Sequence, residues 1–173
     1  PRYPARRIIL TGAFESGKTT LLLLLVDALR ESRLDIAGVI SPPVYKNGEK
    51  TGIDLLNLRD GTRQPLALLR EGETMGKLFT NRWVFSTEAM EEGNRILLDA
   101  TPCDLLIVDE LGPLELERQS GWVNGISAID SQQYCLAVCV IRESLIPAAL
   151  QRWPDVRVIA MTRETQSAQL EEF

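Results

Sequence analysis

The sequence contains no histidine among its 173 residues. Histidine is the side chain that most often transfers protons near neutral pH, and it is a common zinc ligand. Its absence excludes histidine-based catalytic triads and histidine zinc sites. Any proton transfer must therefore use carboxylates, lysine, tyrosine or water.

Cysteine is also scarce. The three cysteines, Cys103, Cys135 and Cys139, form no CxxC pair, and the last two lie in YCLAVCV, an apolar run typical of a strand. Residues four apart in a strand are about 13 Å apart, which is too far for a disulfide. We therefore expect buried, reduced thiols in a cytoplasmic protein.

Long apolar runs and excess positive charge are missing as well. The leucine run from Leu21 to Leu25 is flanked by Lys18 and Asp27 and is too short to span a bilayer, so its five leucines are expected to be core residues. The N-terminal PRYPARR carries no apolar core of a secretory signal. A net charge of −5 and a pI near 4.9 argue against general binding to nucleic acids or anionic membranes. A small anionic ligand in a local site remains compatible with this charge.

What is present predicts an α/β protein. With 45% hydrophobic residues, the chain has the size of one domain with a sizeable core, and we expect residues 1–173 to form a single domain. Strands are predicted at 7–12, 34–42, 82–86, 103–110, 134–141 and 156–161. Helices are predicted at 18–31, 87–99, 116–129 and 147–153 and in the C-terminal tail. This alternation favours a mainly parallel sheet with right-handed crossovers. Turn signals at Asn47-Gly48 and Asp60-Gly61, within 44–69, add antiparallel hairpins and make the sheet mixed.

One motif indicates a ligand. The segment Gly12-Ala13-Phe14-Glu15-Ser16-Gly17-Lys18-Thr19 fits G-x-x-x-x-G-K-[ST], and it follows a strand and opens a helix, as that motif requires. Glycines let successive N–H groups turn inward, and the helix N-terminus adds its positive dipole end. We expect Lys18 to reach the β- and γ-phosphates, the Thr19 hydroxyl to bind Mg²⁺, and Thr20 to complete the nucleotide-binding set. The Glu15 carboxylate would repel phosphate, so its side chain is expected to point to solvent.

A second site follows the strand 103–110. Asp109 ends its apolar run in the position of a carboxylate that holds Mg²⁺ through waters. Glu110 is predicted to deprotonate a water for attack on the γ-phosphate, which is general-base catalysis without histidine. Arg142, just past the strand 134–141, is a candidate phosphate-binding cation alongside Lys18, with a surface salt bridge as the alternative. Arg163, just past the last predicted strand, is a weaker candidate for the same phosphate-binding role. Glu115 is a weaker candidate to bond Lys18 or the metal shell, although a carboxylate at the start of a helix is the simpler role for it.

These residues resemble a known family. GKTTLL, VDELGPLEL and GVISPPVYKNGEKTGIDLLNL together look like the P-loop nucleoside triphosphatases of the thermostable-NTPase family, which is related to the human cancer-related nucleoside triphosphatase. The resemblance implies a P-loop, RecA-like three-layer sandwich with a mainly parallel mixed sheet and inserted antiparallel hairpins. It also implies slow Mg²⁺-dependent hydrolysis of ATP, GTP and other triphosphates. Family roles carry over to Lys18 and Thr19 in the phosphate loop, Asp109 at the metal and Glu110 at the water.

The chain departs from the family pattern at several positions. Family loops usually have glycine at the position of Glu15 and proline near Phe14. In the hairpin an acidic pair is replaced by Pro42-Pro43 and an arginine by Tyr45, and after the last strand Thr165-Gln166 replaces an Asn-Arg pair. The differences at Phe14 and Glu15 leave the shape and phosphate affinity of the loop open, and the other two leave the preferred nucleobase and any protein contacts open.

Two other functions remain open from the sequence. A small-molecule kinase would use the same loop, but it needs an Arg-rich lid, and the only candidate segment, 68–83, holds few arginines. A nucleotide-dependent switch with negligible turnover is the second alternative, because the phosphate loop indicates binding and only Glu110 indicates hydrolysis.

Overall fold

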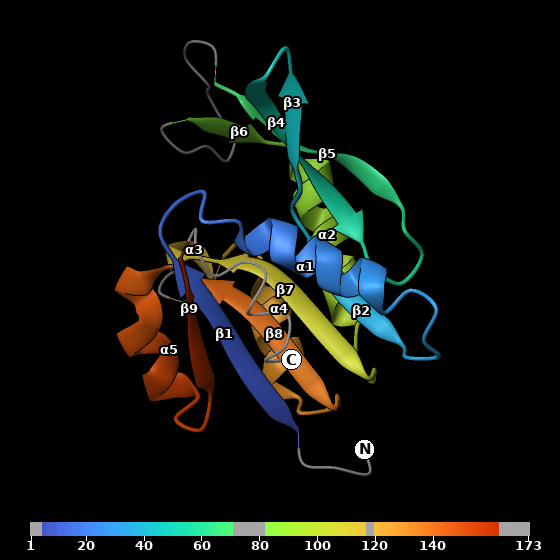
Figure 1. Cartoon of the computed structure of the whole chain (residues 1–173), viewed down its shortest axis with the longest axis vertical. Helices are drawn as coiled ribbons and strands as arrows, with labels where there is room; N and C mark the ends of the chain where they lie inside the picture. The colour runs from blue at the N-terminus through green and yellow to red at the C-terminus, as the bar shows by residue number, and fades with distance from the viewer. Residues whose placement is uncertain (1–4, 71–81, 117–119, 163–173) are drawn as a thin grey trace.

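The computed structural model describes residues 5–70, 82–116 and 120–162. Within these residues the strands form a single nine-stranded sheet with the order β6-β5-β4-β2-β7-β8-β1-β9, and β3 pairs with β4 outside this path. Figure 1 shows the sheet crossing the molecule, with the hairpin strands rising above the main body.

Five strands form the parallel part of the sheet. In spatial order they are β2 (Ile36–Ile40), β7 (Leu105–Leu111), β8 (Leu136–Ile141), β1 (Arg6–Gly12) and β9 (Arg157–Met161). Their near-continuous apolar sequences are typical of strands that are covered on both faces. All five lie within the segments predicted as strands or extend them by one residue.

The antiparallel part extends the sheet beyond β2. It consists of β3 (Pro43–Lys46), β4 (Glu49–Asn57), β5 (Arg63–Leu69) and β6 (Trp83–Phe85). Asn47 and Gly48, both at positive φ, form the turn between β3 and β4, as the sequence predicted. This region therefore contains the inserted hairpins and places them beside the carboxyl end of β2.

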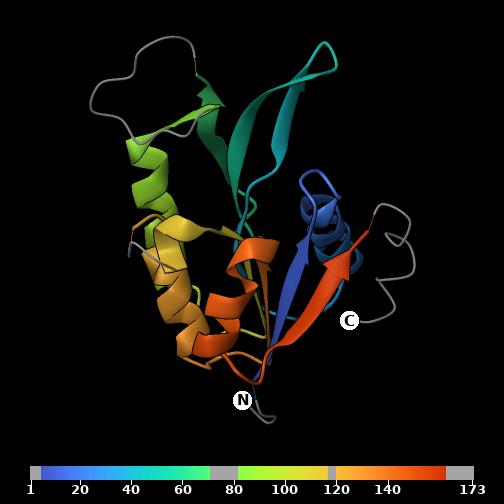
Figure 2. The same ribbon diagram turned by 90° about the vertical axis from the view of Figure 1, so that its left-hand side faces the viewer.

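Helices cover both faces of the sheet, which gives three layers. Figure 2 shows α1 (Lys18–Ala28) on one face and α2 (Thr87–Leu98), α4 (Val123–Asp130) and α5 (Ile146–Arg152) on the other. Two shorter helices, α3 (Pro113–Leu116) and the 3-10 turn η1 (Glu143–Leu145), follow β7 and β8. The start of α2 is fixed by Ser86, whose hydroxyl accepts a hydrogen bond from the N–H of Ala89 at 3.1 Å.

Alternate residues of the central strands pack into two separate hydrophobic cores, one on each face of the sheet. On β7, Leu105 and Ile107 belong to the cluster under α1, whereas Leu106 and Val108 belong to the larger cluster under α2, α4 and α5. This two-residue period is what a strand buried on both faces requires. The observed layers confirm the predicted three-layer arrangement with a mainly parallel mixed sheet.

Two sequence-based expectations need correction. Leu21, Leu22 and Leu25 are buried, but Leu24 is 50% exposed, because α1 packs only one side against the sheet. Likewise only Cys139 is buried, while Cys103 and Cys135 are partly exposed; none of the three is in a disulfide. Among the described residues no helix is both long and apolar enough to cross a membrane.

Candidate active site

A cavity of about 460 Å³ opens at the carboxyl ends of the parallel strands. Such edges are where open α/β sheets bind ligands. Its wall contains every residue of the phosphate motif together with Thr20, Asp109, Glu110 and Arg142, so the structure brings the main predicted site residues together.

The phosphate loop is shaped by its glycines. Gly12, at φ 131°, ends β1 so close to β9 that a side-chain Cβ there would collide with the carbonyl oxygen of Met161. Gly17, at φ 91°, precedes the first residue of α1 in a conformation that favours glycine. The loop therefore turns directly from strand to helix and presents the N-terminus of α1 to the cavity.

Lys18 lies across this loop. Its Nζ donates hydrogen bonds to the carbonyl oxygens of Gly12 and Ala13, at 2.9 and 2.8 Å, and to Ser16 Oγ at 3.1 Å. Burial lowers the pKa of Lys18, although the carboxylates of Asp109 and Glu110 act in the opposite direction. A partly desolvated ammonium in this position attracts anions more strongly than one in water.

Glu15 is placed as the sequence predicted. It is exposed and has a positive φ of 58°, and the neighbouring Phe14 is 70% exposed. Glu15 also lines the cavity, but phosphate binding by such a loop relies on backbone N–H groups, so an exposed carboxylate at this position is compatible with the loop.

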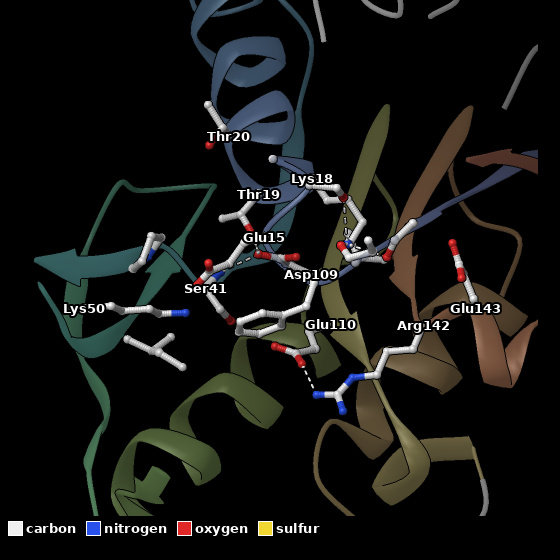
Figure 3. Close-up of a pocket in the computed structure, with 18 of the residues that line it drawn as sticks. Glu15, Lys18, Thr19, Thr20, Ser41, Lys50, Asp109, Glu110, Arg142 and Glu143 are labelled. Atoms are coloured by element: carbon white, nitrogen blue, oxygen red, sulfur yellow. Dashed lines mark hydrogen bonds and ion pairs between the residues drawn. The ribbon is translucent and has the colours of Figure 1, made fainter. Parts of the chain in front are cut away.

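Asp109 is the buried carboxylate of the site, at 2% exposure. Its Oδ2 accepts hydrogen bonds from Thr19 Oγ1 at 3.1 Å and from the N–H of Ser41 at 3.0 Å (Figure 3). Burial raises the pKa of Asp109 to about 6, against the lowering effect of the Ser41 N–H. The structure thus joins the end of β7 to the start of α1 and to the end of β2.

Glu110 projects into the cavity because β7 is irregular at this point. The register between β7 and β8 shifts between Val108 and Leu111, and Glu110 has a positive φ of 66°. Bulges of this kind redirect side chains and occur often beside active sites. The Glu110 carboxylate accepts a hydrogen bond from Arg142 Nη2 at 2.6 Å, as Figure 3 shows.

The pair of Thr19 and Asp109 has the chemistry of a magnesium site. A hydroxyl oxygen and a carboxylate oxygen lie 3.1 Å apart at the cavity wall, and Mg²⁺ prefers hard oxygen ligands, usually one or two from protein with the rest from water and phosphate. The described residues contain no cluster of three or more acidic, cysteine or histidine side chains that could hold a metal alone. The residues present therefore fit a metal that is bound jointly with a phosphate ligand.

Of the two weaker candidates, the structure places Glu115 away from Lys18 and Asp109, and Arg163 lies outside the described residues. The buried Glu115 accepts hydrogen bonds from the N–H groups of Gly112, at 2.7 Å, and Trp122, at 2.8 Å. It binds neither Lys18 nor the Asp109 pair, so its expected link to them is wrong and its role at the helix start holds. Arg163, Thr165-Gln166 and most of the candidate lid 68–83 lie outside the described residues.

Sequence reasoning missed five polar residues of the cavity wall. Ser41, Tyr45 and Lys50 come from β2 and the hairpin, and Glu143 and Ser144 follow Arg142 in η1. A signal was present for Ser41, since it directly follows an apolar strand at the ligand-binding edge. Tyr45 and Lys50 gave no such signal, because their position depends on how the hairpin folds over the sheet.

Comparison with known proteins now decides the family. A family model described as NTPase matches residues 7–173. The chain belongs to this NTPase family. Membership confirms the resemblance predicted from the sequence and the predicted enzyme class, a nucleoside-triphosphate hydrolase.

Individual members of the NTPase family are similar over most of their length. The chain is 32% identical over 160 residues to the nucleoside-triphosphatase THEP1 of Ignicoccus hospitalis, covering 91% of this chain and 90% of that protein. It is 28% identical over 159 residues to the protein of the same name from Methanothermobacter thermautotrophicus, covering 91% and 88%. The solution structure of a human cancer-related nucleoside triphosphatase superposes with a TM-score of 0.73 at 24% identity, over 96% of this chain and 94% of that one. This likeness confirms the P-loop fold.

Proposed function

We propose that this chain is a Mg²⁺-dependent nucleoside triphosphatase that hydrolyses the β–γ bond of ATP, GTP and other nucleoside triphosphates. The observation that carries the proposal is the convergence of the Thr19–Asp109 oxygen pair, at 3.1 Å, with Glu110 in the cavity wall beside the phosphate loop. Binding requires only the loop, whereas hydrolysis also requires a base next to the metal-binding carboxylate.

The loop residues hold the triphosphate. The backbone N–H groups of residues 13–19 and the N-terminus of α1 face the phosphates, and Lys18 Nζ exchanges its carbonyl partners, Gly12 and Ala13, for β- and γ-phosphate oxygens. Thr19 and Asp109 would hold Mg²⁺. An ion held there would neutralise part of the negative charge on the phosphates.

Glu110 supplies the base. Its carboxylate accepts a proton from a water whose oxygen attacks the γ-phosphorus, the bond from that phosphorus to the β–γ bridging oxygen breaks, and the products are nucleoside diphosphate and inorganic phosphate. Arg142, which now donates to Glu110 at 2.6 Å, lies where it can donate to the oxygens of the transferred phosphoryl group.

We propose that the enzyme discriminates little between the nucleobases of its substrates. The sequence contains no N-K-x-D guanine motif. We further propose that residues 1–173 act as one unit and that the protein works in the cytoplasm, where its three thiols stay reduced.

The decisive experiment compares Mg²⁺-dependent phosphate release from ATP, GTP, CTP and UTP by the wild type and by Glu110→Gln. Sustained release by the wild type, lost in Glu110→Gln while nucleotide binding survives, supports the proposal. Glu91→Gln, an exposed glutamate on α2, is the matched control and should hydrolyse at the wild-type rate. Tight binding without turnover in the wild type would favour the switch function instead. Phosphate transfer to an added hydroxyl acceptor would favour the kinase.

A further inference from the structure

Three cationic side chains line the described cavity, and only one of them lacks an anionic or carbonyl partner. Lys18 is bound to loop carbonyls, and Arg142 is paired with Glu110. Lys50 lines the same cavity but forms no ion pair with the carboxylates of the described residues. A lysine with no counter-ion in a site for polyanions is available to bind a phosphate oxygen.

The hairpin geometry holds Lys50 at the cavity. Lys50 on β4 is the direct cross-strand partner of Tyr45 on β3, and both side chains line the cavity. The register between these strands shifts between Val44 and Tyr45, which changes the face that the following residues present. Lys50 Nζ also lies 5.2 Å from the centre of the Trp83 ring on β6, two strands away in the sheet, so this ring limits the positions that the ammonium can take.

The hairpin side of the cavity, where Lys50 lies, is also the side next to Asp109, the proposed metal-binding carboxylate. Ser41, which links β2 to the hairpin, donates its N–H to Asp109 Oδ2 at 3.0 Å. In Figure 3, Lys50 extends from the hairpin toward Ser41 and the middle of the cavity, opposite Arg142 and Glu143. The phosphate that faces Asp109 and Glu110 is the terminal one, so it is the phosphate between Lys50 and Arg142.

We propose that Lys50 binds the terminal phosphate of the nucleotide and makes the site selective for nucleoside triphosphates over diphosphates. The charges of the cavity favour such a contact. Asp109, Glu110 and Glu143 all place negative charge around the position of the γ-phosphate, and a cation from the hairpin offsets their repulsion of that group. The contact also makes Lys50 a catalytic residue, because charge on the terminal oxygens persists through the transfer step. This inference rests on the proposed function.

The experiment compares Lys50→Met, which keeps the length of the side chain and removes its charge, with Lys50→Arg, which keeps the charge. Affinities for Mg-ATP and Mg-ADP are measured in a Glu110→Gln background, so that turnover does not alter the ligand. We expect Lys50→Met to weaken ATP binding about tenfold to a hundredfold while ADP binding stays within about twofold, because one charge-assisted contact is lost. Lys50→Arg should retain most of the selectivity. Lys46→Met, at the exposed end of β3 and outside the cavity, is the control and should match the parent protein.

The competing explanation is that Lys50 only stabilises the hairpin through Trp83. In that case ATP and ADP binding would weaken together, or neither would change, and either result would overturn the proposal. The outcome is separable from that of the proposed function. If the wild type releases no phosphate but Lys50→Met still loses selectivity for ATP, hydrolysis is refuted and the Lys50 contact stands. If the wild type hydrolyses ATP and Lys50→Met has unchanged kcat and selectivity, only the Lys50 contact is refuted.

Discussion

Arg142 Nη2 lies 2.6 Å from Glu110 Oε1, so the proposed base and the proposed phosphate-binding cation are held by one another. Their side chains are 49% and 61% exposed for Glu110 and Arg142 respectively. An ion pair this exposed to water adds little to folding stability. We therefore expect the Glu110–Arg142 pair to affect the rate of hydrolysis rather than folding stability, because each side chain fixes the position of the other at the cavity.

Arg142→Ala should accordingly reduce kcat strongly and stability hardly at all. We expect kcat to fall by about 10² to 10³, as on removal of one transition-state donor, with a change in unfolding free energy below about 1 kcal/mol. Phosphate-release kinetics and urea unfolding give the two numbers. Arg152→Ala, which removes an exposed ion pair between the last residues of α5 and α4, Arg152 and Asp130, is the control and should leave kcat unchanged. A variant of Arg142 with wild-type kcat would show that the pair is only a surface contact.

Asp109→Asn should abolish the response to Mg²⁺. The amide keeps an oxygen for the Ser41 N–H and the Thr19 hydroxyl, so the fold should survive, but the charge that binds the cation is lost. We expect phosphate release to fall at least about 10³-fold and not to recover when Mg²⁺ is raised tenfold. Asp104→Asn is the matched control, because Asp104 precedes the same strand at its other end and accepts a hydrogen bond from the Asp35 N–H at 2.8 Å. Equal Mg²⁺ titrations for the two variants would contradict the assignment of Asp109.

The phosphate loop and the Asp109–Glu110 pair could be predicted because their signals are local. Eight consecutive residues specify the loop, and a strand that ends in two acids specifies the edge at which they lie. Parallel strands present their carboxyl ends at one edge, so the two segments were expected to meet. The alternation of strands and helices predicted the mainly parallel sheet, and the family resemblance implied its three layers.

Other features of the site and fold could not be predicted, because they depend on contacts between residues that are far apart in the sequence. The contribution of Lys50 depends on a register shift in the β3–β4 hairpin and on Trp83, which is 33 residues further along the chain. The partner of Glu115 is a backbone N–H at Trp122, which no side-chain pattern reveals. The exposure of Leu24 depends on which side of α1 faces the sheet, and five consecutive leucines carry no periodicity from which this could be deduced.

Gly93→Ala tests the packing of α2 on α4. A methyl group at Gly93 would overlap the six-membered ring of Trp122, which is buried at 4% exposure. Overpacking costs about 1–3 kcal/mol, which exceeds the roughly 1 kcal/mol that alanine gains over glycine in a helix. We expect the Tm to fall by a few degrees, at about 2–4 °C per kcal/mol for a chain of this size.

A double-mutant cycle gives the control for Gly93. In a Trp122→Leu background the ring is absent, so Gly93→Ala should no longer destabilise the protein and the two changes should couple by about 1 kcal/mol or more. Additive effects would mean that the loss arises elsewhere in α2. Leu98→Ala, at a position of α2 that is 65% exposed, should change the Tm by less than about 2 °C.

The three thiols should differ in reactivity, because burial raises the pKa of both Cys103 and Cys139 to about 12. Near pH 8.5 both stay protonated in the folded protein, so iodoacetamide should modify Cys135 at most, and Cys135→Ala should gain no adduct until it is unfolded. Intact mass after timed alkylation measures the reactivity of the thiols. Rapid alkylation of native Cys135→Ala would show that at least one of the two remaining thiols is accessible as a thiolate, contrary to the raised pKa values of Cys103 and Cys139.

The raised pKa values of Cys103 and Cys139 also make the stability of the fold depend on pH. In the unfolded chain these thiols ionise near pH 9, so their contribution to stability is full below that pH and is lost progressively as pH rises from about 9 to about 12. Urea unfolding of Cys139→Ala beside the wild type at pH 8 and pH 10 measures the dependence of stability on pH.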